Sequence, residues 1–248
     1  MKSEKNQKIL EQTKEIYNAI APQFSDTRGK WWQPPFELKE ELKDGMNVLD
    51  LGCGNGRFAE LFRGRNIEYL GIDNSEEFIK ICQERFAGES NIKFEVGDAL
   101  DFSRRDKKFD LVLMIAVLHH LPSRELRLKA LQNVFNMLSD GGQLMMRNWN
   151  LWNLKMAKKY YKCLFDLPYK ISRGVWNLND AFIAWKPLGT DDLRYVHSFK
   201  KGEMRRLLKK SGFSQFKQYY ETYDNNQPVS IWRGYNLVSV AVKKNCKK

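Results

Sequence analysis

Cysteine is scarce in this chain of 248 residues, and the few cysteines are scattered. The four stand at positions 53, 82, 163 and 246, and no two of them form a C-x-x-C pair. This pattern has neither the ligand spacing of a zinc site nor the density of a disulfide framework. We therefore expect no metal centre, and we expect a reducing cytoplasm as the location.

Long apolar runs are missing as well. No run approaches the ~20 residues that are needed to cross a bilayer, and residues 1–8 lack the apolar core of a signal peptide. We therefore expect no membrane as a partner. Hydrophobic residues still make up 42% of the chain, which is enough for the core of one domain with an insertion or cap.

Acidic residues are too few to balance the basic ones. Asp and Glu number 30, whereas Lys and Arg number 42, so the formal net charge is +12 at pH 7. A basic surface raises the local concentration of polyanions, and nucleic acid is the leading candidate among them. The alternative is a soluble protein that is merely basic.

The most informative stretch is an apolar run that ends in three glycines spaced two apart. Residues 48–51 are followed by Gly52, Cys53, Gly54, Asn55 and Gly56, and then by a helix-compatible segment over residues 57–62. Glycine lets the backbone adopt positive φ and come close to a ligand. The spacing differs from the G-x-G-x-x-G dinucleotide fingerprint, so the loop by itself is only a weak indication of a nucleotide-like cofactor.

Three further runs rich in β-formers end in residues that suit a ligand site. Residues 69–72 precede Asp73, residues 92–96 precede Gly97, Asp98 and Ala99, and residues 109–114 run into Ile115 and Ala116. Helix-like segments separate the runs, an alternation typical of βα units around a parallel sheet. In such sheets ligands bind beyond the carboxyl ends of the strands, and an acid about 20 residues after a glycine loop suits ribose hydroxyls. We therefore expect these strand ends to converge on one ligand.

The remaining segments predict a single domain over residues 1–248. Its expected parts are an N-terminal helical lid over 1–45, a cofactor-binding core over 46–146, a cap or insertion over 147–198, and a C-terminal helix with the last strands over 199–248. We predict a helix over 9–19 closed by Pro22. Ser75 and Ser123 are predicted N-caps of helices that reach residues 86 and 138, the second closed by 140–142. Later elements are strands over 143–146, 214–220 and 235–242 and a helix over 200–210.

Tryptophan and lysine gather in the segment 147–198. Trp149, Trp152, Trp176 and Trp185 lie in it, together with basic residues between positions 155 and 173. A long insertion beside an active site is often a lid or a binding loop. The tryptophans could stack on unpaired bases and the lysines could contact phosphates. The alternatives are core tryptophans and a solvated basic face.

The glycine loop resembles the first motif of class I S-adenosylmethionine-dependent methyltransferases. The chain as a whole resembles the tRNA wobble-uridine carboxymethyl methyltransferase family, in residues 16–28, 115–125, 185–186 and 194–199. The resemblance implies a Rossmann-like α/β fold, with a seven-stranded, mostly parallel sheet and helices on both faces. Arg57 departs from the lysine common in the family, Trp32 displaces a proline, and residues 147–180 align poorly. The reaction is therefore better indicated than the substrate.

The resemblance implies S-adenosyl-L-methionine as the cofactor and assigns residues to it. Gly52 and Gly54 would approach the methionine moiety and the ribose, and Asp73 would bind the ribose hydroxyls. Asp98 would accept a hydrogen bond from the adenine amino group, and the carbonyl region of Ala116 would hold the methionine end. Tyr17, Cys53, Asn74 and Ala99 complete the predicted cofactor site, with Tyr17 closing over it or simply packing in its helix.

The implied reaction is methyl esterification of a carboxymethyl-type group on a wobble uridine of tRNA. A carboxylate is already ionised at pH 7, so no strong general base is required, and positioning and desolvation would supply most of the catalysis. The predicted catalytic residues are Arg28, which could hold the substrate carboxylate or a phosphate, and His119 and His120 beside the pocket. The alternatives are a surface ion pair for Arg28 and backbone hydrogen bonding for the histidines.

The expected partners are tRNA and, because family members can depend on one, a small zinc-binding activator protein. Two other functions stay open. A small-molecule methyltransferase for a lipid-like or quinone precursor would have an apolar cap pocket and no RNA affinity. A non-catalytic RNA-binding or partner module would fail to bind S-adenosylmethionine, and the intact Gly52, Gly54, Asp73 and Asp98 argue against it.

Overall fold

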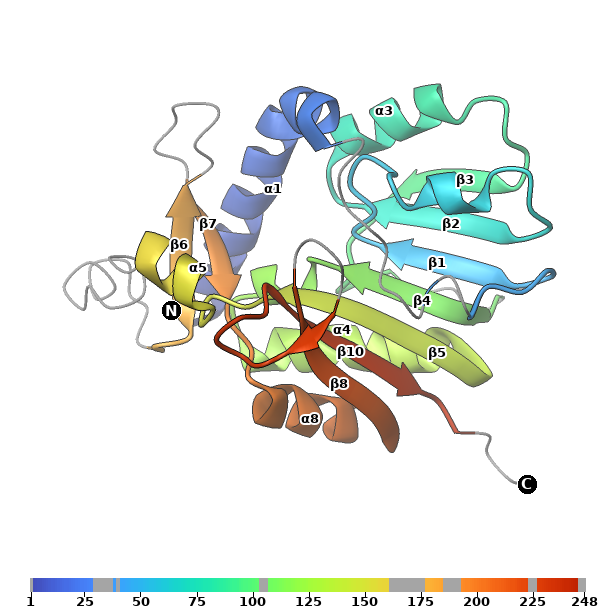
Figure 1. The fold of residues 1–248 in the computed structure, drawn as a ribbon. Coiled ribbons are helices and arrows are strands. Elements are labelled where there is room, and N and C mark those ends of the chain that lie inside the picture. Colours follow the sequence, from blue (N-terminus) through green and yellow to red (C-terminus); the bar gives the residue numbers. More distant parts are fainter. Residues whose placement is uncertain are drawn as a thin grey trace.

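The computed structural model describes residues 2–28, 38, 41–102, 107–160, 177–184, 193–222 and 227–244 (Figure 1). Its main sheet has eight strands in the order β3-β2-β1-β4-β5-β10-β8-β9. The strands are β1 (Asn47–Leu51), β2 (Glu68–Asp73), β3 (Ile92–Val96), β4 (Phe109–Ile115), β5 (Leu138–Trp149), β8 (Gln215–Glu221), β9 (Pro228–Val229) and β10 (Asn236–Val242). The first five in spatial order are parallel, and β10 is antiparallel to both neighbours. The predicted mostly parallel α/β sheet is confirmed, with the two-residue β9 as one strand more than predicted.

The core lies on both faces of this sheet because successive residues of a strand point to opposite sides. In β1, Val48 joins one buried cluster and Leu49 joins the other. Two helices, α4 (Arg124–Met137) and α8 (Lys201–Lys210), supply buried side chains to the cluster of Leu49. The 3₁₀ helix η1 (Ala59–Phe62) and the helix α3 (Glu76–Arg85) supply the cluster of Val48. Helices therefore cover both faces, as predicted.

The predicted N-caps and the helix ends near residues 86 and 138 are confirmed, whereas the helix expected after the glycine loop and the turn expected over 140–142 are not. The hydroxyls of Ser75 and Ser123 accept from backbone N–H groups three residues on, at 3.2 and 3.3 Å. The segment after the glycine loop forms only the 3₁₀ turn of η1. The turn predicted over 140–142 lies inside β5, because Gly141 and Gly142 exchange backbone hydrogen bonds with Lys243, each 2.9 Å long. That distant pairing extends β5 beyond the predicted strand.

The N-terminal helix α1 (Lys2–Arg28) continues through Pro22, where the sequence predicted its end. Pro22 is exposed, so its ring projects away from the core. Before it, Ile16 and Ile20 are buried, and beyond it the ring of Phe24 lies 5.4 Å from that of Phe78. Apolar packing on both sides of the proline accounts for the continued helix, because it outweighs one lost backbone hydrogen bond.

A small second sheet lies within the segment predicted as a cap. It is the antiparallel hairpin of β6 (Asp180–Ala184) and β7 (Leu193–His197), which packs against the short helix α5 (Leu154–Lys159). Phe182 and Tyr195 of the hairpin contact Ile9 of α1. Figure 1 shows the hairpin and α5 beyond the carboxyl ends of the parallel strands, on the same side as α1. The hairpin therefore helps to seat α1 at that edge.

None of the helices in the described part of the chain combines the length and hydrophobicity that crossing a bilayer would need. Within the same residues, no group of three or more His, Cys, Asp or Glu side chains is placed to hold a metal ion.

Candidate active site

A cleft lies at the carboxyl ends of β1, β2 and β4, where the strand order changes direction around β1. It has about 990 Å³ of empty space, counting the part open to solvent. The cleft is lined by all nine residues that the sequence assigns to the cofactor: Tyr17, Gly52, Cys53, Gly54, Asp73, Asn74, Asp98, Ala99 and Ala116. Residues far apart in the chain therefore converge there.

The glycine loop needs its glycines for two different reasons. Gly52 and Gly54 have φ of 75° and 54°, a region that side chains disfavour. A Cβ on Gly52 would lie 2.2 Å from Cγ2 of Val117, so the loop and the segment after β4 touch there. A Cβ on Gly54 would meet no atom within 4 Å. Gly54 therefore leaves open space on the cleft side for a ligand.

Asp73 holds the loop with both carboxylate oxygens. Oδ2 accepts from the N–H of Gly54 at 2.8 Å, and Oδ1 accepts from the N–H of Ser75 at 2.9 Å. Burial raises the pKa of Asp73, and these two hydrogen bonds offset only part of that rise. Asp98 lies two residues beyond the end of β3, and its Oδ1 accepts from the N–H of Leu100 at 2.8 Å. The two acids thus have fixed orientations at the cleft.

Ala116 is strained. Its φ is 62°, and no other non-glycine residue in the described ranges has a positive φ. Its N–H donates to the carbonyl of Arg147 at 2.7 Å, which ties the segment after β4 to β5. Strained backbone of this kind tends to gather at functional sites, which agrees with the place of Ala116 on the cleft wall.

A buried pair behind the loop, Asp50 and Tyr69, was not predicted as part of the site. The Tyr69 hydroxyl donates to Oδ2 of Asp50 at 2.8 Å, and both side chains are almost fully buried. Burial raises the pKa of Asp50 to about 7, although the Tyr69 hydrogen bond acts in the opposite direction. The acidic residue inside the apolar run 48–51 was the signal that could have found this pair.

His120 is neutral and its tautomer is set by its partners. Nδ1 lies 2.7 Å from the carbonyl oxygen of Tyr195, which can only accept, so Nδ1 carries the proton. Nε2 then accepts from the Tyr17 hydroxyl at 2.8 Å. Burial, and then the positive charge of Arg194, lower the pKa of His120 to about 3. The sequence placed His120 beside the pocket, and the structure puts it on the cleft wall.

Arg194 completes a polar chain that reaches the cleft. Its Nη1 donates to the Tyr17 hydroxyl at 3.1 Å, and its guanidinium carbon lies 5.5 Å from the ring centre of Tyr17 and 5.4 Å from that of Trp149. Only 3% of Arg194 is exposed. It was not predicted as a site residue, although the sequence stretch 194–199 had been singled out. Arg194, Tyr17 and His120 thus form one chain from a buried cation to the cleft.

The structure gives a different result for the other two predicted catalytic residues, His119 and Arg28. His119, at the middle of the 3₁₀ helix η2 (Leu118–His120), is fully buried and is not among the residues that line the cleft. Its Nδ1 accepts from the N–H of Trp149 at 3.3 Å, and burial lowers its pKa well below the usual value. The structure gives His119 a packing position behind His120. Arg28 ends α1, and its side chain lies outside the described residues, as do Trp32, Trp176 and Trp185.

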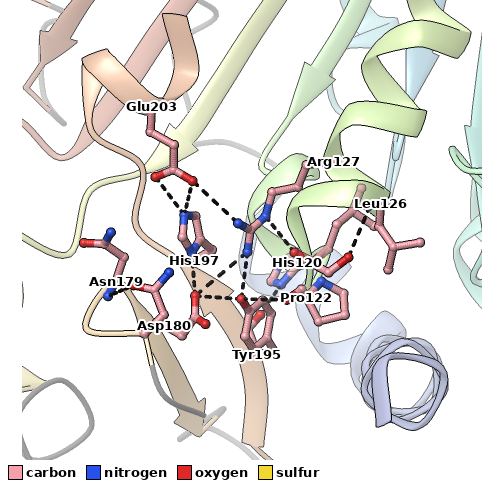
Figure 2. A network of polar contacts seen from close by, with 12 residues as sticks. His120, Pro122, Leu126, Arg127, Asn179, Asp180, Tyr195, His197 and Glu203 are labelled. Carbon is pink, nitrogen blue, oxygen red and sulfur yellow. Dashed lines mark hydrogen bonds and ion pairs between the residues drawn. The ribbon is translucent and has the colours of Figure 1, made fainter. Parts of the chain in front are cut away.

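A second polar network stands behind β7 (Figure 2). Oδ1 of Asp180 accepts from the Tyr195 hydroxyl at 2.7 Å and contacts Nδ1 of His197 at 2.5 Å. Nε2 of His197 lies 2.9 Å from Glu203, and Arg127 donates to the Tyr195 hydroxyl at 2.8 Å. The network ties the β6–β7 hairpin to α4 and α8. Tyr195 belongs to this network, and its backbone carbonyl accepts from His120. The network therefore also holds the part of β7 that orients His120 on the cleft wall.

The sequence matches a family model described as a methyltransferase domain over residues 42–212. The chain belongs to this family. The match spans β1 to the end of α8, and so includes the loop, Asp73, Asp98 and Ala116. The predicted class of S-adenosylmethionine-dependent methyltransferases is thereby confirmed, with S-adenosylmethionine as the cofactor of the class.

Two relatives of this methyltransferase are named for the same activity. The chain is 33% identical to tRNA (carboxymethyluridine(34)-5-O)-methyltransferase ALKBH8 of Mus musculus over 160 residues, which are 64% of this chain and 23% of that protein. It is 28% identical to tRNA (carboxymethyluridine(34)-5-O)-methyltransferase of Schizosaccharomyces pombe over 228 residues, 84% of this chain and 90% of that protein. The chain thus spans under a quarter of the first relative and most of the second.

Solved structures show the same fold. An S-adenosylmethionine-dependent methyltransferase from Methanosarcina mazei has a TM-score of 0.67 and 21% identity, over 86% of this chain and 99% of that one. A chain of the complex between the Haloferax volcanii Trm112 methyltransferase activator and a methyltransferase has a TM-score of 0.59 and 16% identity, over 92% and 98% of the two chains. At these identities the likeness concerns the fold.

Proposed function

We propose that this methyltransferase transfers a methyl group to the carboxylate of a carboxymethyl-type wobble uridine in tRNA. The observation that carries the proposal is a cleft with two kinds of wall. The glycine loop and the acids Asp73 and Asp98 line one part. Tyr17 and His120, with Arg194 behind Tyr17, line another. The names of the relatives from Mus musculus and Schizosaccharomyces pombe support a tRNA carboxymethyluridine as the acceptor.

The residues of the first wall suit S-adenosylmethionine. Gly52 and Gly54 would face its methionine moiety and ribose, since Gly54 leaves open space there. Asp73 would accept from the ribose hydroxyls with the lone pairs its loop bonds leave free, and Asp98 would accept from the adenine amino group. The backbone of Ala116 would hold the methionine end. Cys53, Asn74, Ala99 and Tyr17 would complete the cradle.

The second wall suits an anionic acceptor. When bound, S-adenosylmethionine supplies an electrophilic methyl group on a sulfonium. The acceptor carboxylate forms the new C–O bond while the C–S bond breaks and leaves its electron pair on sulfur, so no proton has to move. His120 is neutral and hydrogen-bonded at both nitrogens, which suits a positioning role. Arg194 supplies a positive charge behind Tyr17.

Arg28 keeps its predicted role within this scheme, whereas His119 takes a supporting role in place of the predicted catalytic one. Arg28 would hold the substrate carboxylate or a phosphate from the end of α1. His119 would support His120, because their ring centres lie 4.3 Å apart. We also propose a small activator protein as a partner, since the similar Haloferax volcanii fold is named in a complex with such an activator. A tRNA acceptor agrees with the predicted cytoplasmic location.

A labelled methyl group tests the reaction. The protein is incubated with methyl-labelled S-adenosylmethionine and tRNA that bears unmethylated carboxymethyluridine, and the RNA is then treated with mild alkali. Label that is released as volatile methanol identifies a methyl ester. tRNA without the carboxymethyl group is the matched control and should take up no label.

Two other outcomes would contradict the proposal. Label that survives alkali on the RNA would place the methyl group on a base or ribose. No incorporation, with S-adenosylmethionine binding intact and an activator supplied, would exclude this tRNA as the acceptor and favour a small-molecule substrate.

A further inference from the structure

One face of the molecule combines exposed apolar side chains with positive charge. We call it the α5 face, and it consists of Trp152, Leu154, Lys155, Lys158, Lys159, Leu178, Lys200, Trp232 and Arg233. Backbone contacts join its parts, because the N–H of Leu154 donates to the carbonyl of Trp232 at 2.9 Å. Lys200 connects to the same face, since its Nζ lies 4.7 Å from the ring centre of Trp152.

The apolar part of this face is unusually open. Among the described residues, the exposed large hydrophobic side chains are Val96 and three members of the α5 face. Those three are Leu154, Leu178 and Trp232, which are 64%, 60% and 54% exposed. Exposed apolar side chains that gather in one place mark binding surfaces more often than single ones do. The gathering therefore points to a partner.

The charge of the face indicates what kind of partner it is. Lys155, Lys158, Lys159, Lys200 and Arg233 are all exposed. In the described stretches 149–160, 177–184, 193–202 and 227–244, the only carboxylate is that of Asp180, which is 9% exposed and engaged with His197 and Tyr195. No described ion pair involves these five cations. Within these described stretches the face therefore carries positive charge and no exposed carboxylate, which suits a polyanion.

A shallow hollow on the face adds a place for a base. It is lined by Trp152, Asn177, Leu178, Asn179 and Lys200 and has about 790 Å³ of empty space, counting open solvent. An indole ring gives a stacking surface, a lysine beside it can meet a phosphate, and amides can meet base edges. This combination of aromatic platforms and cations is how proteins bind single-stranded nucleic acid.

The face lies at the same end of the sheet as the cleft. The last residue of β5, Trp149, has its ring centre 5.2 Å from that of His119 and 6.4 Å from that of His120, and α5 begins five residues later. Figure 1 shows α5 and α1 at the same edge of the sheet. An RNA that presents one base to the cleft can therefore extend its neighbouring nucleotides over α5.

We propose that the α5 face binds the unpaired nucleotides beside the methylated base of the RNA substrate. The hollow at Trp152 takes a stacked base, and the lysines of α5 take the backbone phosphates. This proposal rests on the proposed function, since it assigns the RNA contacts of the same reaction.

The test compares charge reversals at two places. Lys155→Glu/Lys158→Glu changes the α5 face. Lys80→Glu/Lys93→Glu makes the same change in charge on α3 and on the edge strand β3, which three strands separate from β5, and both lysines are exposed. Trp152→Leu removes the stacking surface. Binding of a fluorescent anticodon stem-loop RNA is measured by anisotropy at several salt concentrations, with S-adenosylmethionine affinity measured by calorimetry as a folding control.

We expect Lys155→Glu/Lys158→Glu to weaken RNA binding at least ~10-fold and to lower its salt dependence, because contacts to phosphate release counterions. Trp152→Leu should weaken it ~5-fold or more through lost stacking. The control pair should stay within about twofold. Equal losses in both pairs, or none in either, would overturn the proposal, as would a wild-type protein that does not bind the RNA. Failure of the proposed function is separate, because it shows as RNA binding without ester formation.

Discussion

Replacing Gly52 by alanine should introduce two energetic costs that glycine avoids at this position, a steric clash and a strained backbone conformation. The new Cβ would stand 2.2 Å from Cγ2 of Val117 and 3.3 Å from its Cβ and Cγ1. Valine is stiff at χ1, and rotation cannot move its own Cβ, so the backbone has to shift. The φ of 75° adds a second cost that is independent of the contact.

Each of the two costs has a typical magnitude, and the two add. A left-handed conformation costs an alanine roughly 1–2 kcal/mol, and overpacking typically costs ~1–3 kcal/mol, so Gly52→Ala should destabilise the protein by about 2–5 kcal/mol. Gly45 is the matched control, because its φ is 82° and a Cβ there meets nothing within 4 Å. Gly45→Ala should cost only the ~1–2 kcal/mol of the backbone.

A double mutant isolates the contact. Val117→Ala removes the two Cγ atoms, so Gly52→Ala/Val117→Ala should be more stable than the sum of the single changes by ~1–3 kcal/mol. Urea unfolding gives the free energies, and calorimetry gives the affinity for S-adenosylmethionine, which should fall in Gly52→Ala because Val117 also lines the cleft. The reasoning is refuted if Gly52→Ala costs no more than Gly45→Ala, or if the two sites show no coupling.

Three further predictions concern the acids and the polar chain. Asp73→Ala should weaken binding of S-adenosylmethionine by ~1–3 kcal/mol in calorimetry, because the ribose loses its acceptor. Asp50→Asn should raise the free energy of unfolding at pH 8 by at most ~4 kcal/mol and leave it unchanged near pH 4, as measured by urea unfolding. Tyr17→Phe should lower kcat/KM, by ~10-fold or more in initial-rate assays, because His120 loses its donor at Nε2 and Arg194 loses its acceptor.

The sign of the Asp50 effect follows from its raised pKa. The folded protein keeps this proton up to about pH 7, whereas the unfolded chain releases it near pH 3.8. The associated stability is therefore complete below the unfolded value and is lost as the pH rises from about 4 to about 7. Asp140→Asn makes the same substitution at an exposed position and is the matched control. A wild-type protein whose stability does not fall over that range more steeply than that of Asp50→Asn would contradict the prediction.

The predictions for Asp73→Ala and Tyr17→Phe each have an outcome that would contradict them. Unchanged affinity in a folded Asp73→Ala protein would mean that the cofactor lies elsewhere. For Tyr17→Phe, unchanged kcat/KM would show that the chain from Arg194 does not serve the acceptor. The low pKa of His120 adds a check, because the rate should show no inflection from this ring between pH 5 and 8.

Local patterns were enough to predict the part of the cleft that the glycine loop and the strand-end acids line. The glycine spacing, the acids after the strands and the serine caps each depend on residues within a few positions, and parallel strands bring their carboxyl ends to one edge. Asp73 and Asp98 could therefore be placed at the cleft without knowing what covers them. The helix expected to stop at Pro22 shows the limit of such patterns, since packing of Phe24 on Phe78 continues it.

The tertiary structure decided how Arg194, Tyr17 and His120 are joined into one polar chain. His119 and His120 are adjacent in the sequence, and only folding buries the first and places the second on the cleft. The contact between Arg194 and Tyr17 spans 177 positions, and that between His120 and Tyr195 spans 75. No local periodicity carries such pairings, because they depend on how α1 and the β6–β7 hairpin dock on the sheet. The sequence by itself determined which loop and strand-end residues line the cleft, and the docking of distant elements determined that Arg194, Tyr17 and His120 meet there.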